Sequence, residues 1–65
     1  MTTADAKTFT TDELTSMNAE VSASVAKFEA IGEANGGLTD SQQAFYGEQL
    51  KARRIIREEI RSRAK

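Results

Sequence analysis

Apolar residues recur along two stretches of the chain with the three- and four-residue spacing of an amphipathic helix. The first stretch carries its apolar face at Leu14, Met17, Val21, Val25, Phe28 and Ile31. The second stretch carries its apolar face at Leu38, Phe45, Ala52, Ile56 and Ile60, with Tyr46 and Leu50 on the flank. The pattern therefore predicts two helices, each of which must bury one face.

Capping signals indicate where each predicted helix begins. Thr10 is followed three residues later by Glu13, and Thr39 is followed at the same distance by Gln42. Each pair has the sequence of a capping box, in which the two residues satisfy each other's backbone N–H groups. We therefore expect a sharp helix start at both places.

A cluster of glycines separates the two stretches. Three of the four glycines fall within residues 32–37 and interrupt the helical pattern. We therefore expect helices over about residues 11–34 and 40–64, joined by a turn at 35–38. Residues 1–8 are polar, and we expect them to form a flexible N-terminal segment.

A connection this short makes two neighbouring helices lie antiparallel. Aligning the apolar faces pairs Phe28 with Phe45 near the turn and Met17 with Ile56 further along. The predicted fold is all-α, a coiled-coil-like antiparallel hairpin of two helices that forms one domain over residues 9–65. Its single apolar seam is thin for a chain of this length. We therefore expect self-association or a partner to complete the hairpin into a bundle.

Charge is distributed unevenly along the chain, although the formal net charge is only −1. Residues 1–49 hold two basic and eight acidic side chains, which gives −6, whereas residues 50–65 hold seven basic and two acidic side chains, which gives +5. Such an asymmetry is typical of a chain that binds an acidic partner or that folds back on itself.

A like-charged row runs along the second predicted helix. It comprises Arg53, Arg57 and Arg61, with Tyr46 and Leu50 continuing it toward the N-terminus. Two pairs nearby have favourable i,i+4 spacing, namely Glu59 with Arg63 and Arg54 with Glu58. In one interpretation of the row, Glu13 and Glu20 of the first helix neutralise it across the seam. In the other, the row meets an acidic surface outside the hairpin.

A second surface lies opposite the apolar face of the first predicted helix. Its members recur at helical spacing and are Ala19, Ala23, Ala26 and Ala30. Alanine is the best helix former and suits a solvated surface, but a row of small side chains also lets another helix approach closely. On the second helix Ile55 lies away from Ile60, and we expect the hairpin to leave Ile55 uncovered.

The composition excludes several kinds of site. The chain has no cysteine and no histidine, which excludes disulfides, thiolate metal sites and the commonest general base. It has no catalytic triad, no HExxH sequence and no phosphate-binding loop. The first residues lack the pattern of a signal peptide, and no stretch is long and apolar enough to span a bilayer. We therefore expect a cytoplasmic, non-enzymatic protein with no cofactor, no metal, no small-molecule substrate and no membrane partner.

These features favour a small protein–protein interaction module that acts through helix packing, such as an accessory subunit, an adaptor, a chaperone-like clamp or an inhibitor. The expected partner is another protein or a second copy of the chain. The alternative is a helical nucleic-acid-associated protein that uses the basic face of the second helix, although the acidic total argues against it. Hairpins of this size occur among secretion chaperones, phage accessory proteins and bacterial regulators, an analogy of fold that assigns no function. The residues expected to bind a partner are Ala19, Ala23, Ala26, Ala30, Tyr46, Leu50, Arg53, Ile55, Arg57 and Arg61.

Overall fold

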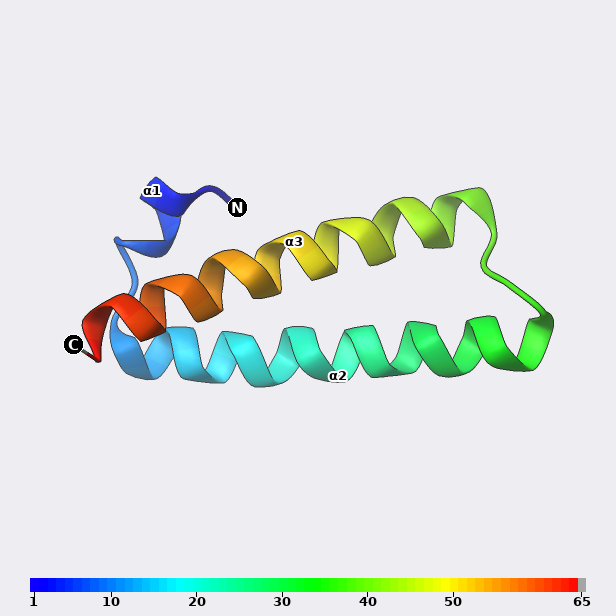
Figure 1. Ribbon diagram of the computed structural model, residues 1–65, viewed down its shortest axis with the longest axis horizontal. Coiled ribbons are helices and arrows are strands. Elements are labelled where there is room, and N and C mark those ends of the chain that lie inside the picture. The colour runs from blue at the N-terminus through cyan, green and yellow to red at the C-terminus, as the bar shows by residue number, and fades with distance from the viewer. Residues whose placement is uncertain (65) are drawn as a thin grey trace.

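The computed structural model describes residues 1–64, and these residues form three helices and no strand. The helices are α1 (Thr3–Ala6), α2 (Thr11–Asn35) and α3 (Asp40–Arg63). The molecule is a rod with extents of 41 × 17 × 16 Å, in which α2 packs against α3 and α1 lies beside α3 (Figure 1). Lys65, which belongs to the domain predicted from the sequence, lies outside the described residues.

Both capping boxes predicted from the sequence are confirmed. At the start of α2 the Thr10 hydroxyl accepts the Glu13 backbone N–H at 3.1 Å, and the Thr10 N–H donates to Glu13 Oε1 at 2.8 Å. At the start of α3, Thr39 and Gln42 make the equivalent two bonds at 3.2 and 3.0 Å. These bonds satisfy backbone donors that have no partner within the first turn of a helix.

Two glycines end α2 and turn the chain. Gly36 has a φ of 73° and Gly37 a φ of 143°, and residues with a side chain rarely adopt such conformations. The N–H groups of both glycines donate to the carbonyl of Gly32, which satisfies an acceptor at the end of the helix. Asn35, which we expected in the turn, is instead the last residue of α2.

Contacts at the two ends of the long helices show how the hairpin closes. Arg63 at the end of α3 donates to the Thr11 hydroxyl at the start of α2 at 3.2 Å. Toward the turn, the ring centroids of Phe28 and Phe45 lie 5.3 Å apart, which confirms the pairing expected from the apolar faces. Figure 1 shows that the helices lie closest near the chain termini and separate toward the turn.

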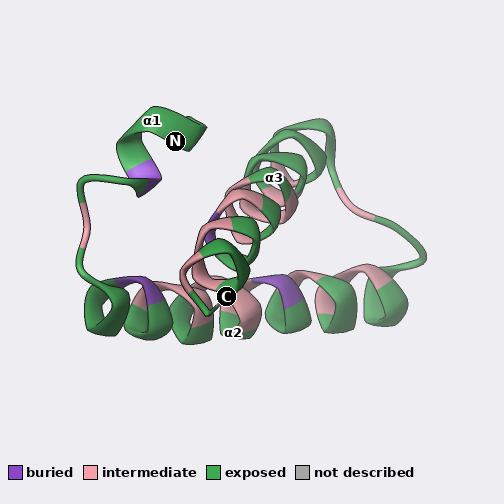
Figure 2. Ribbon diagram, turned by 60° about the vertical axis from the view of Figure 1, so that its left-hand side comes forward, coloured by how far each residue is buried: buried purple, intermediate pink, exposed green. Residues whose placement is uncertain are grey.

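The fully buried core is small (Figure 2). Its members within residues 1–64 are at most 1% exposed and are Ala6, Leu14, Val25 and Ile56. Three of them form one cluster near the chain termini, and the residues that pack against this cluster are Phe9, Met17, Val21, Ile55 and Ile60. Toward the turn, Phe45 keeps 50% of its surface exposed. Much of the apolar surface of the hairpin is therefore only partly covered.

The N-terminal segment, which we expected to be flexible, contains the helical turn α1. The Thr2 hydroxyl accepts the Asp5 N–H at 3.2 Å and the Asp5 carboxylate accepts the Thr2 N–H at 3.0 Å, so this turn also begins with a capping box. Ala6 is fully buried in the core cluster and holds α1 against α3. Apolar periodicity does not predict this turn, because four residues are too few to show a helical repeat.

The surroundings of Ile55 correct a second expectation. We expected the hairpin to leave this side chain uncovered, but Ile55 is half-buried and packs against the cluster that Ala6 completes. The expectation is wrong because a fold of two helices omits α1. Ile55 therefore contributes to the packing of the core, and its expected role in binding a partner stays a prediction.

Candidate functional site

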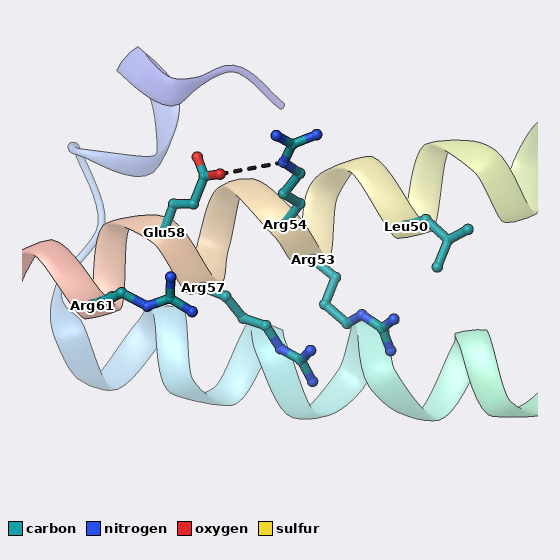
Figure 3. Close-up of a pocket in the computed structure, with 6 residues that line it drawn as sticks. All are labelled: Leu50, Arg53, Arg54, Arg57, Glu58 and Arg61. Carbon is teal, nitrogen blue, oxygen red and sulfur yellow. Dashed lines mark hydrogen bonds and ion pairs between the residues drawn. The ribbon is translucent and has the colours of Figure 1, made fainter.

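An open groove of about 240 Å³ runs along α3 (Figure 3). The side chains that line it are Leu50, Arg53, Arg54, Arg57, Glu58 and Arg61. Three- and four-residue intervals connect these positions, so they share one face of the helix, which we call the arginine face. It brings together the arginine row and Leu50, as the sequence predicts, and it adds Arg54 and Glu58.

The guanidinium groups of the arginine face have few partners. Arg54 Nε lies 3.3 Å from Glu58 Oε1, and this pair is largely exposed to solvent. Arg57 Nε donates to Asn18 Oδ1 of α2 at 3.3 Å, and that acceptor is neutral. Figure 3 shows Arg57 pointing toward α2 and Arg54 pointing away from it. Within residues 1–64, Arg54 is the one arginine of the face that pairs with a carboxylate, whereas Arg53, Arg57 and Arg61 form no ion pair.

The interpretation that Glu13 and Glu20 neutralise the arginine row across the seam is wrong for the described residues. Arg57 reaches Asn18 on one flank of the apolar face of α2. Helical geometry puts Glu13 and Glu20 on the opposite flank. Hydrogen bonds from Thr10, mainly from its backbone N–H and secondly from its hydroxyl, also lower the pKa of the Glu13 carboxyl.

Arg63 lies outside the arginine face and has a structural role that the sequence only partly predicts. Its Nε pairs with Glu59 at 2.9 Å, which confirms the pair expected from i,i+4 spacing. Its Nη atoms reach the Thr11 hydroxyl at 3.2 Å and the carbonyls of Ala6 and Lys7 at 3.4 Å. Arg63 therefore ties the segment between α1 and α2 to the end of α3. Spacing along one helix does not predict these contacts, because they join residues far apart in the sequence.

The remaining residues expected to bind a partner do not line the groove. Tyr46 is half-buried, and its ring centroid lies 6.5 Å from that of Phe28, so it belongs to the aromatic packing near the turn. The alanine row of α2 is exposed at all four positions, which are Ala19, Ala23, Ala26 and Ala30. No helix of the described chain covers this row, and its use as a contact surface stays a prediction.

The arginine face has the chemistry of an anion-binding surface. Its four arginines and one glutamate give the groove a formal charge of +3. Guanidinium groups bind carboxylates and phosphates through pairs of parallel N–H donors. Because the groove is open and four of its six lining residues are exposed, it suits the surface of a large partner better than an enclosed small molecule.

A second groove, of about 400 Å³, lies at the turn between α2 and α3. Its lining has no charged side chain and consists of Asn35, Gly36, Gly37, Leu38, Thr39 and Gln42. Two of these side chains are already used in a capping box. Within residues 1–64, no group of three or more acidic side chains could hold a metal ion. The helices of that same part of the chain also lack the length and apolar character needed to cross a membrane.

Comparison with known proteins gives no match to any family model, to any curated protein or to any solved structure. The surface chemistry and the packing of the described residues are therefore the observations that indicate a function.

Proposed function

We propose that this protein is a small non-enzymatic interaction module that docks on an acidic protein surface through the arginine face of α3. In this proposal it works as an accessory subunit, an adaptor, a chaperone-like clamp or an inhibitor in the cytoplasm. Docking packs further helices against the antiparallel hairpin and completes it into a bundle.

The observation that supports this proposal most strongly is the absence of a charge partner for three arginines of the face within residues 1–64. Arginines four residues apart on one helix repel each other. A partner that supplies carboxylates removes this repulsion and replaces it with charge-assisted hydrogen bonds. Leu50, which is half-buried at one end of the groove, adds an apolar contact for the same partner.

The small core supports the same proposal. Four side chains are fully buried within residues 1–64. Ordering the backbone of each residue costs roughly 1–2 kcal/mol in conformational entropy, and a short chain buries little apolar surface to offset that cost. A partner that binds only the folded chain stabilises it by mass action. The exposed alanine row of α2 is the predicted site where a partner helix approaches most closely.

A nucleic-acid-associated protein is the alternative, because guanidinium groups bind phosphates as well as carboxylates. The four arginines of the groove could follow a phosphate backbone. Against this function stand the charge of −6 in residues 1–49 and the formal net charge of −1. Domains that bind nucleic acid usually have a net positive charge, so we place a protein partner first.

A pull-down from the native cell, followed by measurement of affinity, tests the proposal. The wild-type chain is compared with a variant that carries Arg57→Glu and Arg61→Glu, two exposed positions of the arginine face. Lys51→Glu is the matched control, because it reverses an exposed charge of α3 outside the groove. Each captured protein is purified and titrated by calorimetry. We expect equal binding to the wild type and the control, and at least tenfold weaker binding to the double variant, which is about 1.4 kcal/mol.

Nuclease treatment of the extract separates the two functions. Protein capture that survives the nuclease supports an interaction module. Capture that disappears, together with a salt-sensitive gel shift of DNA or RNA by the pure chain, supports the alternative. A captured protein that binds the double variant as tightly as the wild type contradicts docking through the arginine face.

A further inference from the structure

We infer that a second copy of this chain docks on the arginine face, so that two hairpins associate as a symmetric dimer. The inference rests on the proposed function and names the partner. It starts from the surface that contains the arginine face, because the same surface also carries a group of carboxylates.

The contact between Arg57 and Asn18 shows which flank of α2 lies beside the arginine face. Ser22 follows Asn18 by four residues, and Glu29 follows Ser22 by seven, which is two turns of helix. Glu33 follows Glu29 by four residues. The flank of α2 that faces the arginines therefore continues toward the turn with two carboxylates, and both are exposed.

Glu29 and Glu33 are exposed, and within residues 1–64 neither of them forms an ion pair. We call these two residues the acidic half of the surface. It lies toward the turn, whereas the arginine face lies toward the chain termini (Figure 1).

The two halves lie far enough apart to act separately. Glu29 is eleven residues from Asn18, which is about 16 Å along α2. This spacing exceeds the screening length of about 8 Å at physiological ionic strength, and it fits within the 41 Å length of the rod. One side of the hairpin is therefore positive at one end and negative at the other.

A surface of this kind is complementary to itself. When a second copy is turned end for end and placed against the first, its acidic half meets the arginine face of the first copy, and the reverse contact forms at the same time. A twofold axis produces both contacts, as an isologous interface requires. The midpoint between the two halves falls near Leu50, so the axis brings two partly exposed leucine side chains together.

The distribution of charge favours a second copy over the other possible partners. Nucleic acid would be attracted by the arginine face but repelled by the acidic half of the same surface. An acidic protein would satisfy the arginines and leave the two carboxylates of the acidic half unpaired. A second copy satisfies both halves, and the formal net charge of −1 leaves little repulsion between the copies at long range.

Two charge-reversed variants test the inference when they are studied alone and as a mixture. The first carries Arg57→Glu and Arg61→Glu, and the second carries Glu29→Lys and Glu33→Lys, all at exposed helical positions. Sedimentation equilibrium from the micromolar to the low millimolar range gives each dimer affinity. We expect the wild type to dimerise and each variant alone to lose at least tenfold in affinity. In the mixture the acidic half of the first variant meets the unchanged arginine face of the second, and the reversed residues of the two variants meet with opposite signs, so we expect a heterodimer at least tenfold tighter than the homodimer of either variant.

Two control variants each reverse one charge elsewhere on the two helices. Lys51→Glu on α3 and Glu20→Lys on α2 are exposed and lie outside both halves, so we expect them to leave the dimer affinity unchanged. Circular dichroism of every variant verifies that its helices are retained. The mixture provides a second safeguard, because two variants that had failed to fold would not form a heterodimer.

Three results would overturn the inference. They are a wild type that stays monomeric up to about 1 mM, a dimer that neither reversal weakens, and a mixture that remains monomeric. A monomeric wild type that still binds a captured protein through the arginine face refutes the dimer and leaves the proposed function standing. A wild type that neither dimerises nor binds a captured protein through the arginine face refutes both the dimer and the proposed function.

Discussion

Threonine caps each helix of this rod, and a residue three positions later returns the hydrogen bond. The pairs are Thr2 with Asp5, Thr10 with Glu13, and Thr39 with Gln42. In the first two pairs the returning group is a carboxylate, and the backbone N–H and the hydroxyl of the threonine lower its pKa. In the third pair it is an amide that does not titrate. The same geometry is therefore sensitive to pH at two helix starts and insensitive at the other.

The capping box of α2 predicts how stability changes in acid. Because folding lowers the pKa of Glu13, its stabilising effect is present above the unfolded value of about 4.3 and is lost as the pH falls through the folded pKa. Glu13→Gln keeps the box, as Gln42 does in α3, but cannot be protonated. We expect the free energy of unfolding to fall less between about pH 5 and pH 3 in this variant than in the wild type. Urea denaturation across this pH range measures the difference. If the free energy of unfolding depends on pH in the same way in both proteins, Glu13 does not contribute to the loss of stability in acid.

Arg63 of α3 forms hydrogen bonds to both of the other helices. Its guanidinium donates to the carbonyls of Ala6 and Lys7 and to the Thr11 hydroxyl. We expect Arg63→Ala to lower the free energy of unfolding by roughly 1.5–3 kcal/mol, the range for hydrogen bonds to a charged group. The N–H of Ala6, which donates to the Thr2 carbonyl, should exchange with solvent faster in the variant.

Arg54→Ala is the control for this substitution. Arg54 makes an i,i+4 ion pair like that of Arg63, but its pair with Glu58 is exposed. We expect it to change stability by at most about 0.5 kcal/mol and to leave exchange in α1 unaltered. If Arg63→Ala lowers the free energy of unfolding no more than Arg54→Ala does, the hydrogen bonds from Arg63 to α1 and α2 contribute little to stability.

At the scale of the element, the long helices are predictable from the sequence because their signals are local. Apolar spacing defines the faces of α2 and α3, and the threonine pairs define their starts. Gly36 and Gly37 mark the turn because they adopt positive φ. The turn α1 has the same capping signal at Thr2 and Asp5, but it is too short to show periodicity, and tertiary contacts with α3 determine whether it forms.

The aromatic pair near the turn gives a prediction about how α2 and α3 pack. Phe28 and Phe45 are in contact, but Phe45 is 50% exposed. Changing a fully buried phenylalanine to alanine lowers the free energy of unfolding of a protein by roughly 3–5 kcal/mol. We expect Phe28→Ala to lower the free energy of unfolding by about 2–3 kcal/mol and Phe45→Ala to lower it by about 1–2 kcal/mol, because each side chain is only partly buried.

A double-mutant cycle isolates the contact between the two rings. We expect a coupling free energy of about 0.5–1.5 kcal/mol between Phe28→Ala and Phe45→Ala. Thermal or urea denaturation of the four proteins gives the value. Additive effects would mean that the rings do not pack against each other in solution.

At the scale of the whole molecule, the sequence predicts the charges of the candidate site but not their arrangement. The row at Arg53, Arg57 and Arg61 follows from four-residue spacing, and the groove contains it. The sequence alone leaves open which flank of α2 faces that row. The contact between Arg57 and Asn18 answers this question, because it puts Glu20 on the other side of the hairpin.

The same contact explains why the hairpin has charge of both signs on one side. Interactions within each helix neutralise only part of this charge, since the two ion pairs of residues 1–64 lie within α3. The core has few buried side chains, so the isolated chain has little stability to lose. Association through the charged surface is therefore expected to contribute a measurable share of the stability of the fold.

The most direct test of this account is the thermal midpoint of unfolding, measured by circular dichroism over a hundredfold range of protein concentration at low and high salt. Association through the arginine face predicts a midpoint that rises with concentration in the wild type at low salt. The rise should be much smaller near 1 M salt, where the screening length falls to about 3 Å, and in the Arg57→Glu, Arg61→Glu variant. A wild-type midpoint that does not change with concentration at low salt would contradict the account.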